Sequence, residues 1–280
     1  MLNLLTIDVE EYYHVGRPGE GPDGEERRRL PSRVEEDVSR VLDLLDRRRT
    51  RATFFVLGES ALAHPGAVRS IAAAGHEVAS HGFQHIPVDA LERSAFESDL
   101  DRSLEILTSI AGARPAGYRA PIWSLHRATW GLDALVSRGF AYDSSAAPVP
   151  PLGTAGLPHR ISVLPAAAGG GLLEIPPLTG RFGPWRYPVG FALGLRSLPA
   201  RFIRRAVELE NRAGFPALLA FHTWELDPDP PVLRLSPSLA LAHGFGLQGL
   251  GAKLDHLLGS LELSPVREHA AARQLSKEAA

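Results

Sequence analysis

The chain begins with the stretch LNLLTIDVEE (residues 2–11), a short apolar run that ends in acidic residues. A short, continuously apolar run is typical of a strand that is buried on both faces. We therefore expect a strand over residues 2–7, followed at once by Asp8 and Glu10. Because side chains alternate along a strand, these two carboxylates should share one face.

Further segments predict that strands and helices alternate along the chain. Strands that alternate with helices indicate parallel βαβ units, hence an α/β fold. In such folds, functional residues collect just beyond the strand ends, where Asp8, His81 and Arg119 are predicted to lie. The expected strands are 2–7, 52–57, 77–80, 117–120, 140–142, 172–175 and 216–221; the expected helices are 32–48, 59–74, 89–110, 126–138, 199–213 and 252–261; residues 16–31 should be a loop, 148–171 a loop or short hairpin, and 267–280 frayed.

The composition of the chain limits the classes of protein to which it can belong. Its 280 residues are 44% hydrophobic, enough for a sizeable core. The formal net charge of −2 argues against a nucleic-acid-binding protein, which usually carries a basic face. With no cysteine, any metal must be held by histidine and carboxylate oxygen. No targeting segment and no membrane-spanning run is visible, so a cytoplasmic protein is expected.

The segment SHGFQH (residues 80–85) carries two histidines, His81 and His85. Their spacing of four residues would put both rings on one side of a helical turn, as in metal-binding histidine pairs. A divalent metal would also relieve the repulsion between Asp8 and Glu10, binding one carboxylate and leaving the other nearby as a base. The alternatives are solvated acids at a strand end and two unrelated loop histidines.

The segment YRAP (residues 118–121) places an arginine at a predicted strand end. If Arg119 is buried, it needs an anionic partner, and Asp8 is the best candidate. Such a pair would hold Asp8 ionised and oriented. The alternative is a surface arginine.

The segment FHTWE (residues 221–225) brings His222 to the end of an apolar strand, which suits a general acid. Asp143, in YDSS (residues 142–145), is expected to orient it. The alternative is a hydrogen-bonded core histidine. His14 is ambiguous. The remaining histidines lack paired spacing and are expected to be structural or exposed: His64, His76, His126, His159, His243 and His256.

In this order, the segments resemble the five motifs of the polysaccharide deacetylases of carbohydrate esterase family 4, the NodB homology domain. Many members place a metal-binding acid directly after the first aspartate, where this chain has Val9. A branch of the family uses an Asp-x-Asp arrangement instead, and Glu10 looks like its second acid. The exosortase-associated PEP-CTERM locus subfamily is more similar still, through DVEEYYH (8–14), LEIP (173–176) and HTWE (222–225). Its pattern is lost at AHGFGL (242–247).

The resemblance implies a deformed (β/α) barrel over residues 1–230, with residues 231–280 as a C-terminal extension packed on it. It implies metal-dependent removal of N-acetyl groups from amino sugars of a bacterial exopolysaccharide. Zn²⁺ is the expected metal, with Co²⁺, Ni²⁺ or Fe²⁺ as alternatives. The implied roles are metal ligands for Glu10, His81 and His85, catalysis for Asp8, Arg119 and His222, and substrate contacts for Tyr118, Pro121, Trp123, Tyr142, Asp143 and Trp224.

Two other functions remain open at this point. One is a hydrolase of C–N bonds in small cyclic imides or ureides, because the branch with two spaced acids includes such enzymes. The other is an inactive homologue that binds carbohydrate. The expected partner is an N-acetylated polysaccharide or oligosaccharide, with no nucleic acid and no membrane span, and the sequence leaves the oligomeric state open.

Overall fold

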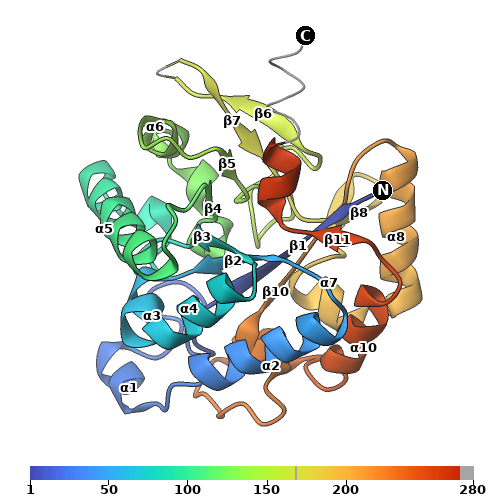
Figure 1. Cartoon of the computed structure of the whole chain (residues 1–280), viewed down its shortest axis with the longest axis horizontal. Coiled ribbons are helices and arrows are strands. Elements are labelled where there is room, and N and C mark those ends of the chain that lie inside the picture. Colours follow the sequence, from blue (N-terminus) through green and yellow to red (C-terminus); the bar gives the residue numbers. More distant parts are fainter. Residues whose placement is uncertain (168, 272–280) are drawn as a thin grey trace.

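A computed structural model describes residues 1–167 and 169–271. Within these residues, one curled sheet forms the centre of the molecule, with helices around its outside (Figure 1). Its strand order is β10-β1-β2-β3-β4-β5-β7-β6, and β11 also pairs with β1. The pairs are parallel except for β6–β7. The expected α/β fold with a deformed barrel is therefore confirmed.

The strands of this sheet are β1 (Asn3–Val9), β2 (Thr53–Val56), β3 (Glu77–Ser80), β4 (Gly117–Tyr118), β5 (Tyr142–Asp143), β6 (Ser162–Pro165), β7 (Gly171–Glu174), β10 (Leu218–His222) and β11 (Leu263–Ser264). A separate antiparallel hairpin consists of β8 (Thr179–Phe182) and β9 (Trp185–Pro188). The α-helices are α1 (Gly24–Arg29), α2 (Val34–Arg47), α3 (Gly58–Ala63), α4 (Pro65–Ala73), α5 (Arg93–Ala111), α6 (Gly131–Ser137), α7 (Ala192–Ser197), α8 (Ala200–Arg212), α9 (Pro237–Gly244) and α10 (Leu250–Leu258).

The register of the parallel strands brings their carboxyl ends together. Asp8 is paired with His222 on β10, and Val56 at the end of β2 is paired with Ser80 at the end of β3. Ser80 is in turn paired with Tyr118 on β4. The residues that follow these strands therefore meet at one edge of the sheet, as the sequence predicts.

The main core lies between the sheet and the helices that cover it. Ile7 and Val9 on β1 are fully buried against apolar residues of α2, such as Val41 and Leu45. Helix α2 begins with three acidic residues and repeats its apolar residues every three or four positions, which gives it one buried face. Burial of this kind holds β1 rigidly, and β1 leads directly to the acidic residues at its end.

Several elements differ from the sequence prediction. The expected helix 59–74 is two helices, because Pro65 starts α4 and the residue before a proline avoids helical backbone angles. The expected loop 16–31 contains α1, whose capping box joins Asp23 and Glu26. Residues 148–171 do contain a hairpin strand, β6, while α7 and the β8–β9 hairpin were not expected.

The C-terminal segment returns to the sheet. Its strand β11 lies beside the start of β1, and the apolar side of α10 is buried in the main core. Residues 266–271 are helical, whereas the prediction of frayed residues covers 267–280 and falls mostly outside the described residues. No helix among the described residues is long and apolar enough to cross a membrane.

Candidate active site

Glu10, His81 and His85 lie together just beyond β1 and β3. Each offers one atom to a group whose members all lie within 4.8 Å of one another. Glu10 Oε2 is 2.9 Å from His85 Nε2 and 3.8 Å from His81 Nε2. Two imidazole nitrogens and one carboxylate oxygen are a donor set that suits a divalent transition metal.

The two histidines are joined by a loop, so the predicted helical turn between them is wrong. Gly82 adopts a left-handed conformation (φ +81°), and the carboxylate of Asp99 accepts hydrogen bonds from the backbone N–H groups of Phe83 and Gln84 (2.7 and 3.1 Å). This loop turns the chain back so that His85 faces Glu10. A spacing of four residues is therefore sufficient to bring both rings to Glu10, although the backbone between them is not helical.

The side chains around the group set the state of its donor atoms. The ring of His81 is bonded through Nδ1 to the carbonyl oxygen of Arg119 (2.8 Å), which makes Nδ1 the donor and leaves the lone pair of Nε2 facing Glu10. Burial lowers the pKa of His81 to about 4, so the ring is neutral near pH 7. Glu10 Oε2 is buried, and its near neighbours are the two imidazole nitrogens, with no well-aligned hydrogen bond. A neutral ring and an orphaned carboxylate oxygen fit a bound metal cation.

His14 supports the ring of His85. The two rings stack with their centroids 5.3 Å apart and their planes 10° from parallel. His14 is itself held at both nitrogens, because Nδ1 accepts from the backbone N–H of Glu11 (3.2 Å) and Nε2 lies 3.3 Å from Glu59. The sequence leaves this histidine ambiguous, and its position makes it a support for the group.

Asp8 is held by Arg119 rather than by the histidines. Arg119 Nη1 donates to Asp8 Oδ1 (2.7 Å), and the rest of the guanidinium donates to the carbonyl and hydroxyl oxygens of Ser144 (3.1 and 2.8 Å). The guanidinium also lies over the rings of Phe55 (4.2 Å) and Trp123 (4.9 Å). Arg119 is 1% exposed, so the expected buried pair with Asp8 is present.

His222 faces both acids from the end of β10. Its Nε2 is 3.5 Å from Glu10 Oε1 and 3.9 Å from Asp8 Oδ2, and its Nδ1 is 3.5 Å from Glu225 Oε1. Burial alone would lower the pKa of His222, but the carboxylates of Glu10, Glu225 and Asp8 raise it to about 9. Its side chain is 30% exposed, against 3% for Glu10, so the site opens to solvent beside His222.

The prediction that Asp143 orients His222 is wrong, because Glu225 occupies that place. Asp143 lies instead beside His126 (3.4 Å) and accepts a hydrogen bond from Ser145 (2.6 Å). Glu225 comes three residues after His222, and its own backbone segment folds back as a short 3-10 helix (Thr223–Leu226). That spacing is the signal by which the sequence could have identified Glu225.

Three of the expected substrate contacts are closed off from solvent: Tyr118, Tyr142 and Asp143 are 1%, 0% and 0% exposed. The hydroxyl of Tyr142 donates to Glu77 (2.9 Å). These side chains support the site from beneath and do not line a groove, which corrects the prediction for them. Pro121 is also buried, and Trp123 is half-buried.

Trp224 is 6% exposed and is stacked between two histidine rings. Its ring lies 5.6 Å from that of His222 and 4.4 Å from that of His243, with nearly parallel planes. Nε2 of His243 lies 2.8 Å from the carbonyl oxygen of Tyr12. Trp224 therefore packs against His222, with His243 behind it, and its predicted contact with substrate stays a prediction.

A second group of possible ligands lies under the strand ends and consists of His126, Asp143 and Glu174. Burial would lower the pKa of His126, but the two carboxylates raise it to about 10, so the ring is an imidazolium. Burial and the charge of Asp143 raise the pKa of Glu174 to about 8, so Glu174 takes up a proton more easily than an ordinary glutamate. Glu174 also accepts a hydrogen bond from the backbone N–H of Ala146 (2.9 Å). The group therefore works as an internal ion cluster that fixes the loop after β5.

Residues 23–139 match the family model for polysaccharide deacetylase, and residues 144–271 match a model described as a domain of unknown function, DUF3473. Over residues 23–139 the chain is therefore similar to polysaccharide deacetylases. The first match includes the loop of His81 and His85 and the strand that leads to Arg119. The second includes His222 and the C-terminal helices.

The chain is similar to a peptidoglycan deacetylase of Helicobacter pylori, with 34% identity over 108 residues that are 39% of this chain and 36% of the relative. The chain spans about a third of the length of such curated relatives. In fold it is similar to a Mycobacterium smegmatis structure named as a polysaccharide deacetylase (TM-score 0.63, 23% identity, covering 98% and 90% of the two chains). It is also similar to Puue allantoinase (TM-score 0.59, 17% identity, 96% and 88%).

Proposed function

We propose that this protein is a metal-dependent hydrolase that removes N-acetyl groups from amino sugars of a polysaccharide or oligosaccharide. The observation that carries the proposal is the group formed by Glu10, His81 and His85, with Asp8 and His222 beside it. The similarity of residues 23–139 to polysaccharide deacetylases supports the reaction class. A bacterial exopolysaccharide is the substrate that the sequence resemblance favours, and Zn²⁺ is the metal.

Glu10, His81 and His85 would hold the metal. A divalent metal at such a set polarises a carbonyl oxygen and lowers the pKa of a bound water. Two features favour Glu10 over Asp8 as the ligand. Glu10 Oε2 faces both imidazoles and accepts no well-aligned hydrogen bond, whereas Asp8 Oδ1 is already bonded to Arg119.

The remaining residues would move the protons. Asp8, fixed by Arg119, takes a proton from the water that adds to the acetamide carbon. His222 is charged near neutral pH and gives a proton to the amine nitrogen as the C–N bond breaks. The products are acetate and a free amino sugar. Asp8 Oδ2 and His222 Nε2 are 3.9 Å apart, which is close enough for the base and the acid to act on the same bond.

The first test measures acetate released from chito-oligosaccharides by the protein as purified, after chelation, and after Zn²⁺ is returned. Release should be lost on chelation and restored by the metal. Equal release before and after chelation would exclude metal dependence. Hydrolysis of cyclic ureides with no acetate release would favour the C–N hydrolase alternative, and glycan binding without turnover would favour the inactive homologue.

A pair of variants separates the two acids. Asp8→Asn should keep one equivalent of metal by elemental analysis and lose acetate release by about 10²- to 10⁴-fold, the usual contribution of a general base. Glu10→Ala should lose the metal itself. Asp43→Asn, an exposed acid on α2, should change neither. If Glu10→Ala kept full metal affinity and Asp8→Asn lost it, the two assignments would have to be exchanged.

A further inference from the structure

The tip of the β8–β9 hairpin exposes two large aromatic side chains. Its sequence is RFGPWR (residues 181–186), and Phe182 and Trp185 are directly paired across the two strands. Phe182 is 80% exposed and Trp185 74%. Aromatic side chains that stand out from a surface mark an interaction site, and tryptophan is enriched at the boundary between membrane and water.

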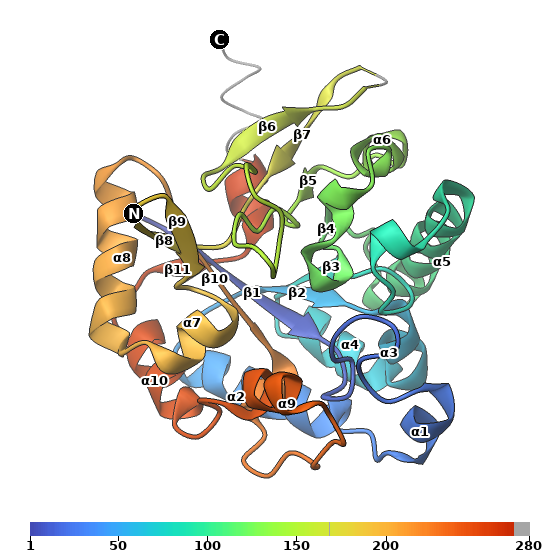
Figure 2. The same cartoon turned by 180° about the vertical axis from the view of Figure 1, so that it is seen from behind.

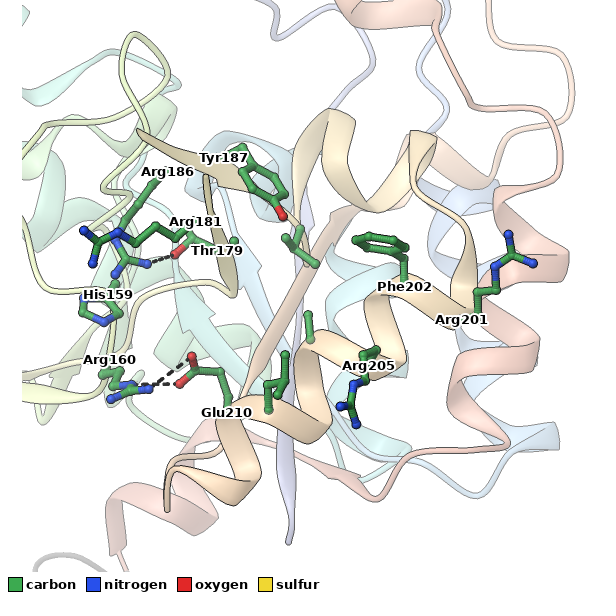
Figure 3. A pocket seen from close by; sticks show the side chains of 14 residues that line it. His159, Arg160, Thr179, Arg181, Arg186, Tyr187, Arg201, Phe202, Arg205 and Glu210 are labelled. Atoms are coloured by element: carbon green, nitrogen blue, oxygen red, sulfur yellow. Dashed lines mark hydrogen bonds and ion pairs between the residues drawn. The ribbon is translucent and has the colours of Figure 1, made fainter. Parts of the chain in front are cut away.

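Beside this hairpin lies a hollow of about 660 Å³ whose walls are rich in arginine (Figure 3). Arg160, Arg181 and Arg186 stand on the side of the hairpin, and Arg201 and Arg205 stand on α8. The acid in this wall, Glu210, is already paired with Arg160 (2.9 Å). Arg205 is paired with Glu208 (3.4 Å), which leaves Arg181, Arg186 and Arg201 without a carboxylate partner among the described residues. The hollow therefore carries an excess of positive charge, although the whole chain carries a net charge of −2.

Two of these arginines lie opposite each other and lack an ion-pair partner among the described residues. Arg181 and Arg186 are directly opposite across the hairpin, and like charges in that position are unfavourable. Burial lowers the pKa of Arg186, and the charge of Arg181 lowers it further. Across residues 1–167 and 169–271, neither guanidinium forms an ion pair with a carboxylate. An anion bound between them would remove the repulsion.

Helix α8 continues the same surface. Its inward side buries Ile203 and Val207, but its outward side exposes Phe202 (55%) and Leu209 (52%), which are seven residues apart and share a face. Both line the hollow, next to the arginines of the helix. Exposed apolar residues flanked by arginine are typical of helices that lie at a membrane surface.

We propose that the hairpin tip and the arginine hollow dock on a membrane that contains anionic lipids. Phe182 and Trp185 enter the interfacial region, while the hollow receives lipid phosphate groups. Phe182 and Trp185 are not part of the wall of the hollow, so they do not form a stacking platform for a sugar held in it. A lipid surface accounts for the two features together, since its phosphates and its apolar boundary lie side by side.

The position of this surface leaves the candidate active site open. In Figures 1 and 2 the β8–β9 hairpin lies near the N-terminus, at the start of β1. Asp8 and Glu10 lie at the other end of that strand. A docked molecule would keep the edge of the sheet that carries His222 away from the lipid. The proposal does not depend on the reaction, and its test needs no substrate.

The test is sedimentation of the full chain with vesicles of phosphatidylcholine alone, or of phosphatidylcholine and phosphatidylglycerol in equal amounts. The parent protein should bind the anionic vesicles at least tenfold more strongly, and less at high salt. Phe182→Ser/Trp185→Ser and Arg181→Glu/Arg186→Glu should each weaken this binding about tenfold or more. Phe182, Trp185 and Arg181 are exposed and Arg186 is half-buried, so thermal unfolding should verify that each variant keeps the fold.

The matched control is Arg47→Glu/Arg69→Glu, which makes the same change in net charge at exposed arginines of α2 and α4. It should bind as the parent does. If this control lost as much vesicle binding as Arg181→Glu/Arg186→Glu, the loss would be due to net charge alone and the proposal would be overturned. The proposal would also be overturned if the parent protein bound no vesicles. The same holds if Arg181 and Arg186 bound an acidic polysaccharide rather than lipid.

Discussion

At the scale of single residues, the state of His222 depends on three acids from two places in the chain. Asp8 and Glu10 face Nε2, while Glu225 lies 3.5 Å from Nδ1 and is itself 3.3 Å from Arg196. Burial disfavours a charged imidazole, so the ring stays charged only because these carboxylates surround it. Under the proposed function, Glu225 is a positioning residue that keeps His222 charged and oriented.

The corresponding prediction concerns Glu225→Gln. An amide keeps the size of the side chain but removes one negative charge, so the pKa of His222 should fall from its raised value. His222 then loses the proton that the leaving amine needs at a lower pH than in the parent protein. The alkaline limb of the kcat/KM profile should therefore move to lower pH, and kcat should fall roughly 10-fold or more. Metal content should not change. Glu208→Gln provides the control, because Glu208 is a partly exposed acid of α8 that is paired with Arg205 (3.4 Å). An unmoved alkaline limb in Glu225→Gln would exclude the proposed role of Glu225.

The sequence could predict Asp8, Glu10, His81, His85, Arg119 and His222 because each follows a recognisable strand. It could not predict the partner of His222. Choosing Glu225 over Asp143 requires the strand register and the turn after β10, and both depend on tertiary packing. The cluster of His126 with Glu174 could not be predicted either, because its members come from separate segments of the chain that only tertiary packing brings together.

At the scale of elements, α2 is joined to the segment after β10 through buried charges. Asp37 on α2 is 1% exposed and lies 2.5 Å from Arg40, which also reaches toward Asp227 (3.8 Å). Burial and the charge of Asp227 raise the pKa of Asp37 to about 7, despite the nearby arginine. Asp227 is also paired with Arg33 (3.2 Å), so it stays charged, while Asp37 is paired with Arg40 and takes up a proton easily.

This arrangement predicts how stability changes with pH. The folded-state pKa of Asp37 lies above its ordinary value of 3.8, so the folded protein holds a proton that the unfolded chain has lost between about pH 4 and pH 7. The contribution of Asp37 to the free energy of unfolding is thus fully present below about pH 4 and is lost as pH rises through 7. Asp37→Asn should be more stable than the parent at pH 8, by roughly 2 kcal/mol after allowance for solvent screening.

Urea unfolding from pH 5 to pH 8 would measure this difference. Asp43→Asn, an exposed acid of the same helix, should follow the parent at every pH. If Asp37→Asn were less stable than the parent at pH 8, the pair with Arg40 would outweigh burial and the direction of the shift would be wrong.

Elements with a clear apolar period were predicted well, and short polar or proline-rich ones were not. Helix α1 has no buried residue, so hydrophobic periodicity could not reveal it, although its capping box in the sequence could have. The β8–β9 hairpin contains glycine and two prolines and exposes its aromatic pair, which is the opposite of a buried strand pattern. Both elements lie on the surface, where packing leaves little signal in the sequence.

At the scale of the whole molecule, the C-terminal segment closes the sheet beside its first strand. β11 pairs with β1 at Asn3 and Leu4, and Leu250, Leu254 and Leu257 of α10 are buried in the main core. Val266 is fully buried, and its backbone N–H donates to Thr53 on β2 (2.8 Å). We therefore propose that residues 231–271 complete the catalytic unit and are not an appended extension.

The prediction is that a chain ended at residue 230 will not fold cooperatively. It would expose the edge of β1 and the core positions that α10 covers, and each leucine of α10 left unburied costs about 2 kcal/mol, a large part of the usual net stability of a domain. A chain ended at residue 271 should unfold at the temperature of the full chain. Circular dichroism during heating would compare the three. A sharp, parent-like transition in the 230-residue chain would show that β1 and its neighbours are stable alone, and the C-terminal segment would then be an independent addition.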